Sequence, residues 1–320
     1  MKHTVFYTDK KVICFMLNYR WGLSMLKSIV MVTMLVTNLN TIEEAYDNHL
    51  GYQVVDEGEI DRSLGSTWGA RGMNKHPYII MQPESGEEVY LRFIEDQSMT
   101  NYRPMGTHGW NSTEILVEDP DALAVELSDS SFNIIGQPYD LYPTPDGPRA
   151  MQALGPSNEV LYFTRIIPGG SGFNLGSAKS YVDRVFIMVV GGPSMKALQE
   201  FYSKNLKMPV TEASDWTIGV ISRLNDLPED TIYPLALASF DKDFLIELDE
   251  YPAVFVPRKR AVNHLPASTS VVSFLVESLE DVDVKWRRPP RKIQGFPYNG
   301  RKVGVTIGPA GEWIELIENK

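Results

Sequence analysis

One pattern constrains the fold more than any other: a strand, a helix and three strands recur along the chain. From Ser28 an apolar strand precedes a helix with a capping-box signature at Thr41 and Glu44, a stop at Gly51 and three strand-like runs. The same order returns at Tyr181. Two further copies begin at "WNSTEILVEDPDALAVEL" and "TSVVSFLVESLEDVDVKW" and end in "EVLYFTRII" and "EWIELIE". The repeat predicts four equivalent modules, numbered here in chain order.

A glycine- and serine-rich segment, "IPGGSGFNLGSAKS" at Ile167–Ser180, divides the modules two and two. We expect an N-terminal extension over residues 1–26 and a first domain, made of modules one and two, over residues 27–167. A linker over residues 168–180 and a second domain, made of modules three and four, over residues 181–320 complete the expected organisation.

Composition and charge narrow the location and the partners. The 320 residues carry a formal net charge of −11, which opposes binding to nucleic acid. The single cysteine, Cys14, fits a reducing compartment. The apolar run Ser28–Val36 is too short for a membrane helix, and Asn18, Arg20 and Trp21 interrupt the apolar part of the N-terminus, unlike an export signal. We therefore expect a cytoplasmic protein with a small-molecule substrate, no membrane or nucleic-acid partner, and a possible homodimer.

Three segments carry a family resemblance. "NLNTIEEAYDNHLGY", "SMKALQEFYSKNLKMPV" and "GPAGEWIEL" resemble the helix and last-strand signatures of the vicinal oxygen chelate superfamily, which groups glyoxalases, bleomycin-resistance proteins and extradiol dioxygenases. The resemblance covers Ser28 to the C-terminus. It implies an α+β fold in which four βαβββ modules pair into two open barrel-like clefts, and each sheet has one face on helices and one toward a ligand.

Two glutamates interrupt apolar last strands. Glu315 lies between Ile314 and Leu316, and Glu247 holds the same place in module three. Since strand side chains alternate, Glu315 shares a face with Trp313, which the resemblance assigns to the cleft. The alternative is a glutamate at a sheet edge, paired with a neighbouring cation.

Metal-using relatives add ligands early in the first strands. Counting back from the helix starts places Met31, Ser112, Arg184 and Val271 there, and the last strands of modules one and two offer Tyr90 and Tyr162. Such a set does not match the ligands that divalent metals prefer, so we predict no metal and no cofactor. Arg184 is predicted to pair with Glu247 or Glu315 in place of the metal. A divalent metal remains the alternative.

A second polar set is expected in the first cleft. Its predicted catalytic residues are Arg92, Glu114, Tyr90 and Tyr162, with Ser112 as a binding residue. The alternative for this set is a surface salt bridge. The segment "SLGSTWGARGM" resembles the lid of relatives and brings Trp68, expected to face inward as an apolar wall, and Arg71, and His76 opens the next strand. These three residues are predicted to bind substrate together with Ser112, Arg184, Glu247 and Glu315.

Three functions fit these features. The first is a metal-independent lyase or isomerase that acts on an organic substrate in a strand-lined cleft. The second is a non-catalytic binding protein that resembles bleomycin-resistance proteins. The third is a divalent-metal enzyme that resembles lactoylglutathione lyase.

Overall fold

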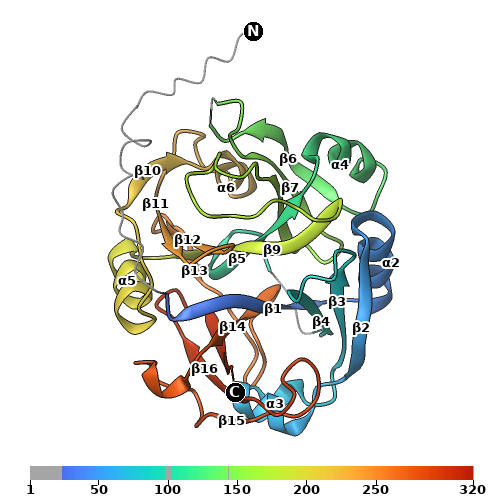
Figure 1. The fold of residues 1–320 in the computed structure, drawn as a ribbon, viewed down its shortest axis with the longest axis vertical. Coiled ribbons are helices and arrows are strands. Elements are labelled where there is room, and N and C mark those ends of the chain that lie inside the picture. Colours follow the sequence, from blue (N-terminus) through green and yellow to red (C-terminus); the bar gives the residue numbers. More distant parts are fainter. Residues whose placement is uncertain (1–23, 98–101, 143, 320) are drawn as a thin grey trace.

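The computed structural model describes residues 24–97, 102–142 and 144–319 and contains two mixed sheets (Figure 1). Most of the expected extension over residues 1–26 lies outside these ranges. Each module follows the predicted order of one strand, one helix and three strands, with short additions. The α+β class and the four βαβββ modules, paired in two sheets, are therefore confirmed.

Modules one and two hold the first half of the chain. Module one comprises β1 (Leu26–Val36), α2 (Leu39–Leu50), β2 (Tyr52–Glu59), α3 (Arg62–Trp68), the short helix η2 (Arg71–Met73), β3 (Pro77–Pro83) and β4 (Tyr90–Glu95). Module two comprises β5 (Thr107–Val117), α4 (Pro120–Leu127), β6 (Asn133–Asp140), β7 (Arg149–Leu154) and β8 (Val160–Arg165).

Modules three and four hold the second half. Module three comprises β9 (Val182–Gly192), α5 (Met195–Glu200), η3 (Phe201–Asn205), β10 (Ser214–Thr217), α6 (Gly219–Leu224), β11 (Ile232–Ser239) and β12 (Leu245–Glu250), and β13 (Val256–Pro257) follows it. Module four comprises β14 (Thr269–Val276), η4 (Leu279–Asp281), β15 (Arg291–Lys292), β16 (Lys302–Ile307) and β17 (Trp313–Glu318).

The modules do not pair in the two sheets as we expected. The first sheet has the order β15-β16-β17-β14-β1-β4-β3-β2 and unites modules one and four. The second has the order β10-β11-β12-β9-β5-β8-β7-β6 and unites modules two and three. The expected pairing of one with two and of three with four is therefore wrong for the sheets. All four first strands are almost wholly buried, so their hydrophobic pattern does not determine which two strands adjoin.

The helices begin at side-chain caps that share one pattern. Asn38, Asp119 and Ser194 each accept a hydrogen bond from a backbone N–H in the first turn of α2, α4 and α5. The cap of α2 is thus Asn38, three residues before the predicted Thr41, because its side chain accepts from the Thr41 N–H. Gly51 ends α2 in the left-handed conformation, as predicted.

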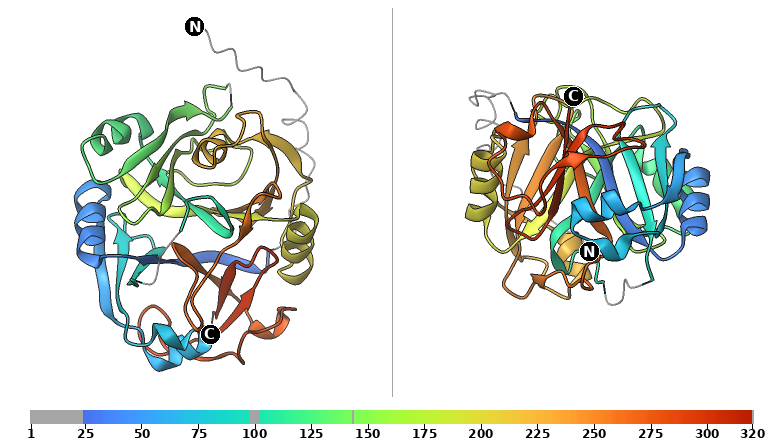
Figure 2. Two further views of the ribbon diagram at one scale, coloured as in Figure 1. Left: turned by 180° about the vertical axis from the view of Figure 1, so that it is seen from behind. Right: turned by 90° about the horizontal axis from the view of Figure 1, so that it is seen from below.

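The two sheets share one apolar core. It contains side chains from both sheets, such as Val32 on β1 and Met188 on β9, together with Tyr46 of α2 and Leu198 of α5. The helices α2 and α5 flank this core on opposite sides (Figures 1 and 2). Each sheet packs one face against this shared core. We call the opposite face of each sheet, which is turned away from the shared core, its inner face. Smaller apolar clusters cover the two inner faces.

Candidate functional site

Four equivalent positions lie on the inner faces. Five residues before the helix caps, the first strands carry Thr33, Glu114, Val189 and Ser273. Each pairs across the ladder with the third residue of a last strand, in the order Arg92, Tyr162, Glu247 and Glu315. The predicted positions Met31, Ser112 and Val271 are therefore two residues too early, Arg184 is five too early, and Arg92 replaces Tyr90. The first strands extend closer to the helix caps than the count from the helix starts assumed.

The first sheet brings Arg92 and Glu315 into one hydrogen-bonded network. Arg92 donates to the hydroxyl of Thr33 from Nη2 at 2.8 Å and to the hydroxyl of Tyr298 from Nη1 at 3.0 Å. Tyr298 in turn donates to Oε1 of Glu315 at 2.9 Å. The indole of Trp68 donates to Oε2 of Glu315 at 2.7 Å. The guanidinium of Arg92 also lies 4.8 Å from the centre of the Trp68 ring.

This network, which we call the first centre, is closed. Arg92, Tyr298 and Glu315 are each at most 1% exposed. Glu315 accepts from three side chains, since the Ser273 hydroxyl also donates to it at 2.7 Å. Its charge is balanced by Arg92 across the Tyr298 hydroxyl. A fully satisfied and buried network of this kind stabilises the fold and offers no free group to a substrate.

The predicted role of Arg184 is therefore wrong. Arg184 lies near the start of β9, in the second sheet, where Nε is 3.4 Å from Glu87 and Nη2 is 3.7 Å from Asp243. Its guanidinium also lies 4.5 Å from the ring centre of Phe244. The cation that faces Glu315 is Arg92, because the sheet joins module four to module one.

The second sheet gathers carboxyl groups on its inner face. Glu114 comes from β5 and Glu247 from β12, and Asp249 follows two residues later on the same side of β12. The hydroxyl of Thr164 donates to Glu114 at 2.5 Å. Tyr162 of β8 pairs with Glu114 across the ladder. We call these four acidic or phenolic residues the second centre.

Several polar atoms of the second centre and its surroundings have no hydrogen-bond partner. Both carboxylate oxygens of Asp249 are buried without one, and so are the hydroxyls of Tyr251 and Ser112. Asp249 is 0% exposed, whereas Glu247 and Tyr162 keep part of their surface open to solvent. Buried polar groups are almost always paired, so such a group indicates a missing ligand, proton or water.

The acids of the second centre hold protons unusually strongly. Burial raises the pKa of Glu114 to about 7 and that of Asp249 to about 8. Burial raises the pKa of Glu247 well above its usual range, and the charges of Asp249 and Glu114 add to the effect. Among the described residues, no lysine, arginine or histidine lies within 4.0 Å of these three carboxylates.

Solved structures share the fold of this chain. Glyoxalase I from Zea mays superposes with a TM-score of 0.62 at 15% identity, covering 91% of this chain and 92% of that one. A mutant of that enzyme gives 0.63 at 13% identity, with 97% and 96% covered. A Bacillus subtilis protein that bears the provisional name of a dioxygenase gives 0.59 at 11% identity, with 93% and 86% covered. The chain has the vicinal oxygen chelate fold. No protein-family model and no curated protein matches the sequence.

The vicinal oxygen chelate fold implies a metal at the four equivalent positions, and the residues present do not fit one. The first centre offers Glu315 with two hydroxyls and the guanidinium of Arg92, which repels a cation. The second offers Glu114 and Glu247 with a tyrosine and the apolar Val189. In the described ranges, no group of three or more His, Cys, Asp or Glu residues is arranged to hold a metal ion.

The expected convergence of one catalytic set is wrong. Arg92 and Tyr90 lie in the first sheet, whereas Ser112, Glu114 and Tyr162 lie in the second. The error follows from the assumed pairing of modules one and two.

The remaining predicted residues, Trp68, Arg71 and His76, come from module one. Arg71 is exposed on η2. His76 is half-buried, and its Nδ1 lies 2.8 Å from the Glu95 carbonyl oxygen. Trp68 faces inward, as expected, where it binds Glu315. None of the three contributes to the second centre.

Sequence reasoning missed Asp249 and Tyr298. Strand alternation could have found Asp249, because the run "IELDE" places it on the same face as Glu247. Tyr298 lies in a loop before β16, and the sequence offers no signal that its hydroxyl reaches Arg92 and Glu315. Pairing Arg92 with Glu315 required knowing which modules share a sheet.

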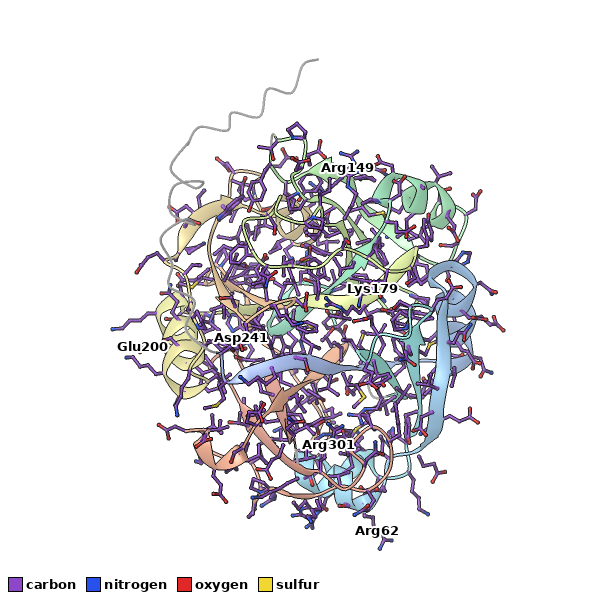
Figure 3. All side chains as sticks on the ribbon, viewed as in Figure 1. Arg62, Arg149, Lys179, Glu200, Asp241 and Arg301 are labelled. Atoms are coloured by element: carbon purple, nitrogen blue, oxygen red, sulfur yellow. The ribbon has the colours of Figure 1, made fainter. Side chains whose placement is uncertain are left out.

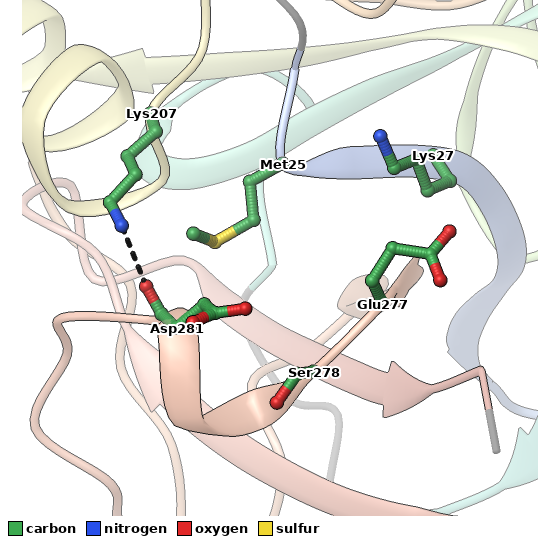
Figure 4. Close-up of a pocket in the computed structure, with 6 residues that line it drawn as sticks. All are labelled: Met25, Lys27, Lys207, Glu277, Ser278 and Asp281. Carbon is green, nitrogen blue, oxygen red and sulfur yellow. Dashed lines mark hydrogen bonds between the residues drawn. The ribbon is translucent and has the colours of Figure 1, made fainter.

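A surface pocket lies apart from both centres. It is lined by Met25 and Lys27 at the start of β1, by Lys207, and by Glu277, Ser278 and Asp281 around η4 (Figure 4). Lys207 donates to the Asp281 carbonyl at 3.1 Å. No helix in the described residues is long and apolar enough to cross a membrane.

Proposed function

We propose that the chain is a small-molecule enzyme that transfers protons with the carboxyl groups of the second centre, as a lyase or isomerase, without a divalent metal. One observation carries the proposal. Glu114, Glu247 and Asp249 are grouped on one sheet face with no basic partner among the described residues, and burial raises the pKa values of all three. Acids whose pKa lies near neutral pH give and take protons readily, as general acid–base catalysis requires.

The three groups suit different parts of a proton transfer. Glu114, with a pKa of about 7, is partly ionised at neutral pH and can remove a proton from a substrate carbon. Glu247 holds its proton more strongly and can donate it to a second carbon or to a leaving group. The phenol of Tyr162, whose pKa burial raises, stays protonated and can donate a hydrogen bond to a substrate oxygen. Solvent reaches Glu247 and restores its proton.

The first centre has a structural role in this proposal. Its guanidinium and carboxylate neutralise one another and are buried with their hydrogen bonds made. The second centre has no neutralising guanidinium, Asp249 is buried without a hydrogen-bond partner, and Glu247 remains accessible. We therefore assign the catalytic role to the second sheet.

Hydrogen exchange with heavy water tests the proposed function without a known product. Carbonyl compounds with an acidic C–H are incubated in D₂O, and NMR follows the loss of the C–H signal. We expect exchange with at least one compound, no effect of chelator, and a loss of about 10²–10⁴-fold in Glu114→Gln, which removes the base that takes the proton from carbon. Glu57→Gln, which changes an exposed glutamate of β2, is the matched control and should keep the wild-type rate.

Two results would contradict the proposal. Saturable binding of compounds without exchange or product at high protein concentration would identify a binding protein of the bleomycin-resistance kind. One tightly bound divalent metal per chain, retained on purification without chelator and required for exchange, would identify a metal enzyme instead.

A further inference from the structure

We propose that the ligand of the second centre carries an organic ammonium group, which binds between Asp249 and the surrounding tyrosine rings. This inference rests on the proposed function, because it takes the second centre as the substrate site. Three acids by themselves do not define a site. The independent observation is Asp249, which is 0% exposed and has both carboxylate oxygens free of any hydrogen-bond partner. An ammonium group supplies several N–H donors as well as the opposite charge.

The protein supplies no cation of its own to Asp249. No arginine or lysine of the described chain contributes to the pKa of Glu114, Glu247 or Asp249. Arg258 is near Tyr251, but its guanidinium is held by five hydrogen bonds, to Thr107, Trp110, Asn111, Ala267 and Thr269.

Two other arginines are paired with acids elsewhere. Arg149, labelled in Figure 3, pairs with Asp121 and Asp140 at 2.6 and 3.0 Å. Arg184 pairs with Glu87 and Asp243. An ionised Asp249 therefore has no cationic partner within the described chain.

Aromatic rings surround the free carboxyl group. Tyr251 follows β12 directly, and its ring centre lies 4.7 Å from that of Phe255 and 6.1 Å from that of Tyr233. Asp249 is close enough to Tyr162, Tyr233 and Tyr251 to raise their pKa values. Gly191 makes room for this arrangement, because a Cβ there would lie 2.5 Å from the Tyr251 ring. Aromatic faces attract organic cations, and acids beside them strengthen the attraction.

These surroundings favour an ammonium group over a metal ion. A hard divalent ion needs about six oxygen ligands at one point, many of them water or carboxylate. The described carboxylates are not arranged for such a site, and tyrosine side chains lie close to Asp249. An ammonium group matches both the acids and the rings.

Binding of a cation must compete with protons. The titratable groups that face the centre are Glu114 of β5, Tyr139 of β6, Tyr162 of β8, Tyr233 of β11, Glu247 and Asp249 of β12, and Tyr102 and Tyr251 of the flanking loops. Asp249 must lose its proton to bind the cation, so affinity should rise with pH toward the pKa of Asp249, about 8.

Paired probes test the inference. Choline is compared with dimethylbutanol, its uncharged carbon analogue, and butylamine with butanol, by calorimetry and NMR titration. We expect each cation to bind at least about tenfold more tightly than its neutral counterpart. Choline has a fixed charge, so its affinity should rise by more than about tenfold between about pH 6 and pH 8, and the rise reports on the protein alone.

Two substitutions test whether choline binds at Asp249. Asp249→Asn keeps the side-chain shape and should weaken choline binding by about tenfold or more. Glu57→Gln, on the exposed face of β2, should bind choline like the wild type.

Several outcomes would overturn the inference. They are equal binding of charged and neutral probes, no saturable binding of either cation up to about 100 mM, unchanged choline affinity in Asp249→Asn, and stoichiometric binding of Mg²⁺ or Mn²⁺ that this variant abolishes. The proposed function can fail separately. Exchange of uncharged carbonyl compounds that depends on Glu114, without amine binding, would overturn the ammonium inference and leave the proposed proton transfer intact.

Discussion

At the residue scale, Arg92 and Glu315 are buried opposite charges joined through the Tyr298 hydroxyl. Arg92→Met leaves the Glu315 carboxylate buried without a cation, so we expect a loss of about 3–5 kcal/mol in the free energy of unfolding. Chemical denaturation at neutral pH measures it. Arg71→Met changes an exposed arginine and should cost under about 0.5 kcal/mol. A loss in Arg92→Met as small as in this control would mean that the pair is not buried.

Asp249 should make the stability of the protein depend on pH. Its pKa is about 8 in the folded protein, above the ordinary 3.8, so the folded state binds its proton more strongly. The stabilisation is fully present below about pH 4 and is lost as the pH rises toward 8, by up to about 1.4 kcal/mol per pH unit. Asp249→Asn should flatten this decline in denaturation curves. An unchanged slope would contradict the raised pKa.

The residue scale also shows what sequence could predict. That a guanidinium would stand beside a cleft glutamate followed from the cost of burying a lone carboxylate. Which arginine it would be could not be predicted from the sequence, since Arg92 lies near Glu315 only because β1 adjoins β14. Glu247 and Glu114 were found from their polar positions in apolar strands, but they belong to one centre only because β5 adjoins β9.

At the element scale, two turns share one feature, a buried glutamate that accepts a hydrogen bond from a tyrosine of a helix. "GPSNE" before β8 and "GPAGE" before β17 each end in a buried glutamate, Glu159 and Glu312. Tyr46 of α2 donates to Glu159 at 3.0 Å, and Tyr202 of η3 donates to Glu312 at 3.2 Å. Burial raises the pKa of Glu159 to about 7 and that of Glu312 to about 8. Hydrogen bonds between a helix and a turn thus connect module one to module two and module three to module four. The sheets instead join module one to module four and module two to module three.

Removing either tyrosine hydroxyl should cost stability, because it leaves a buried carboxyl oxygen without its donor. We expect Tyr46→Phe and Tyr202→Phe each to lose about 1–3 kcal/mol in chemical denaturation. Tyr139→Phe, on the more exposed β6, serves as the comparison and should lose less. Equal losses of unfolding free energy in all three variants would show that these two buried hydrogen bonds stabilise the protein no more than the more exposed Tyr139 hydroxyl does.

At the scale of the whole molecule, each sheet needs both halves of the chain. β1 pairs with β14, and β5 pairs with β9, across the glycine-rich linker. Residues 1–167 and 168–320, expressed separately, should therefore fail to form folded monomers, whereas co-expression should restore a soluble complex. Size-exclusion chromatography and circular dichroism distinguish these states. A folded, monomeric half would mean that the halves are the independent domains that the sequence predicted.

The module count and the α+β class were predictable, because each strand and helix has its own local pattern of apolar residues and caps. The pairing of modules was not. It depends on contacts between strands such as β1 and β14, whose partners are more than two hundred residues apart in the chain.

The central claim is that the second centre holds carboxyl groups poised to exchange protons near neutral pH. Carboxyl-detected NMR titration of the protein, with Asp249→Asn and Glu114→Gln used for assignment, tests it without any substrate. The account predicts that Glu114 titrates near pH 7 and Asp249 near pH 8. Titration of both groups near about pH 4, the range of exposed carboxyls, would contradict it.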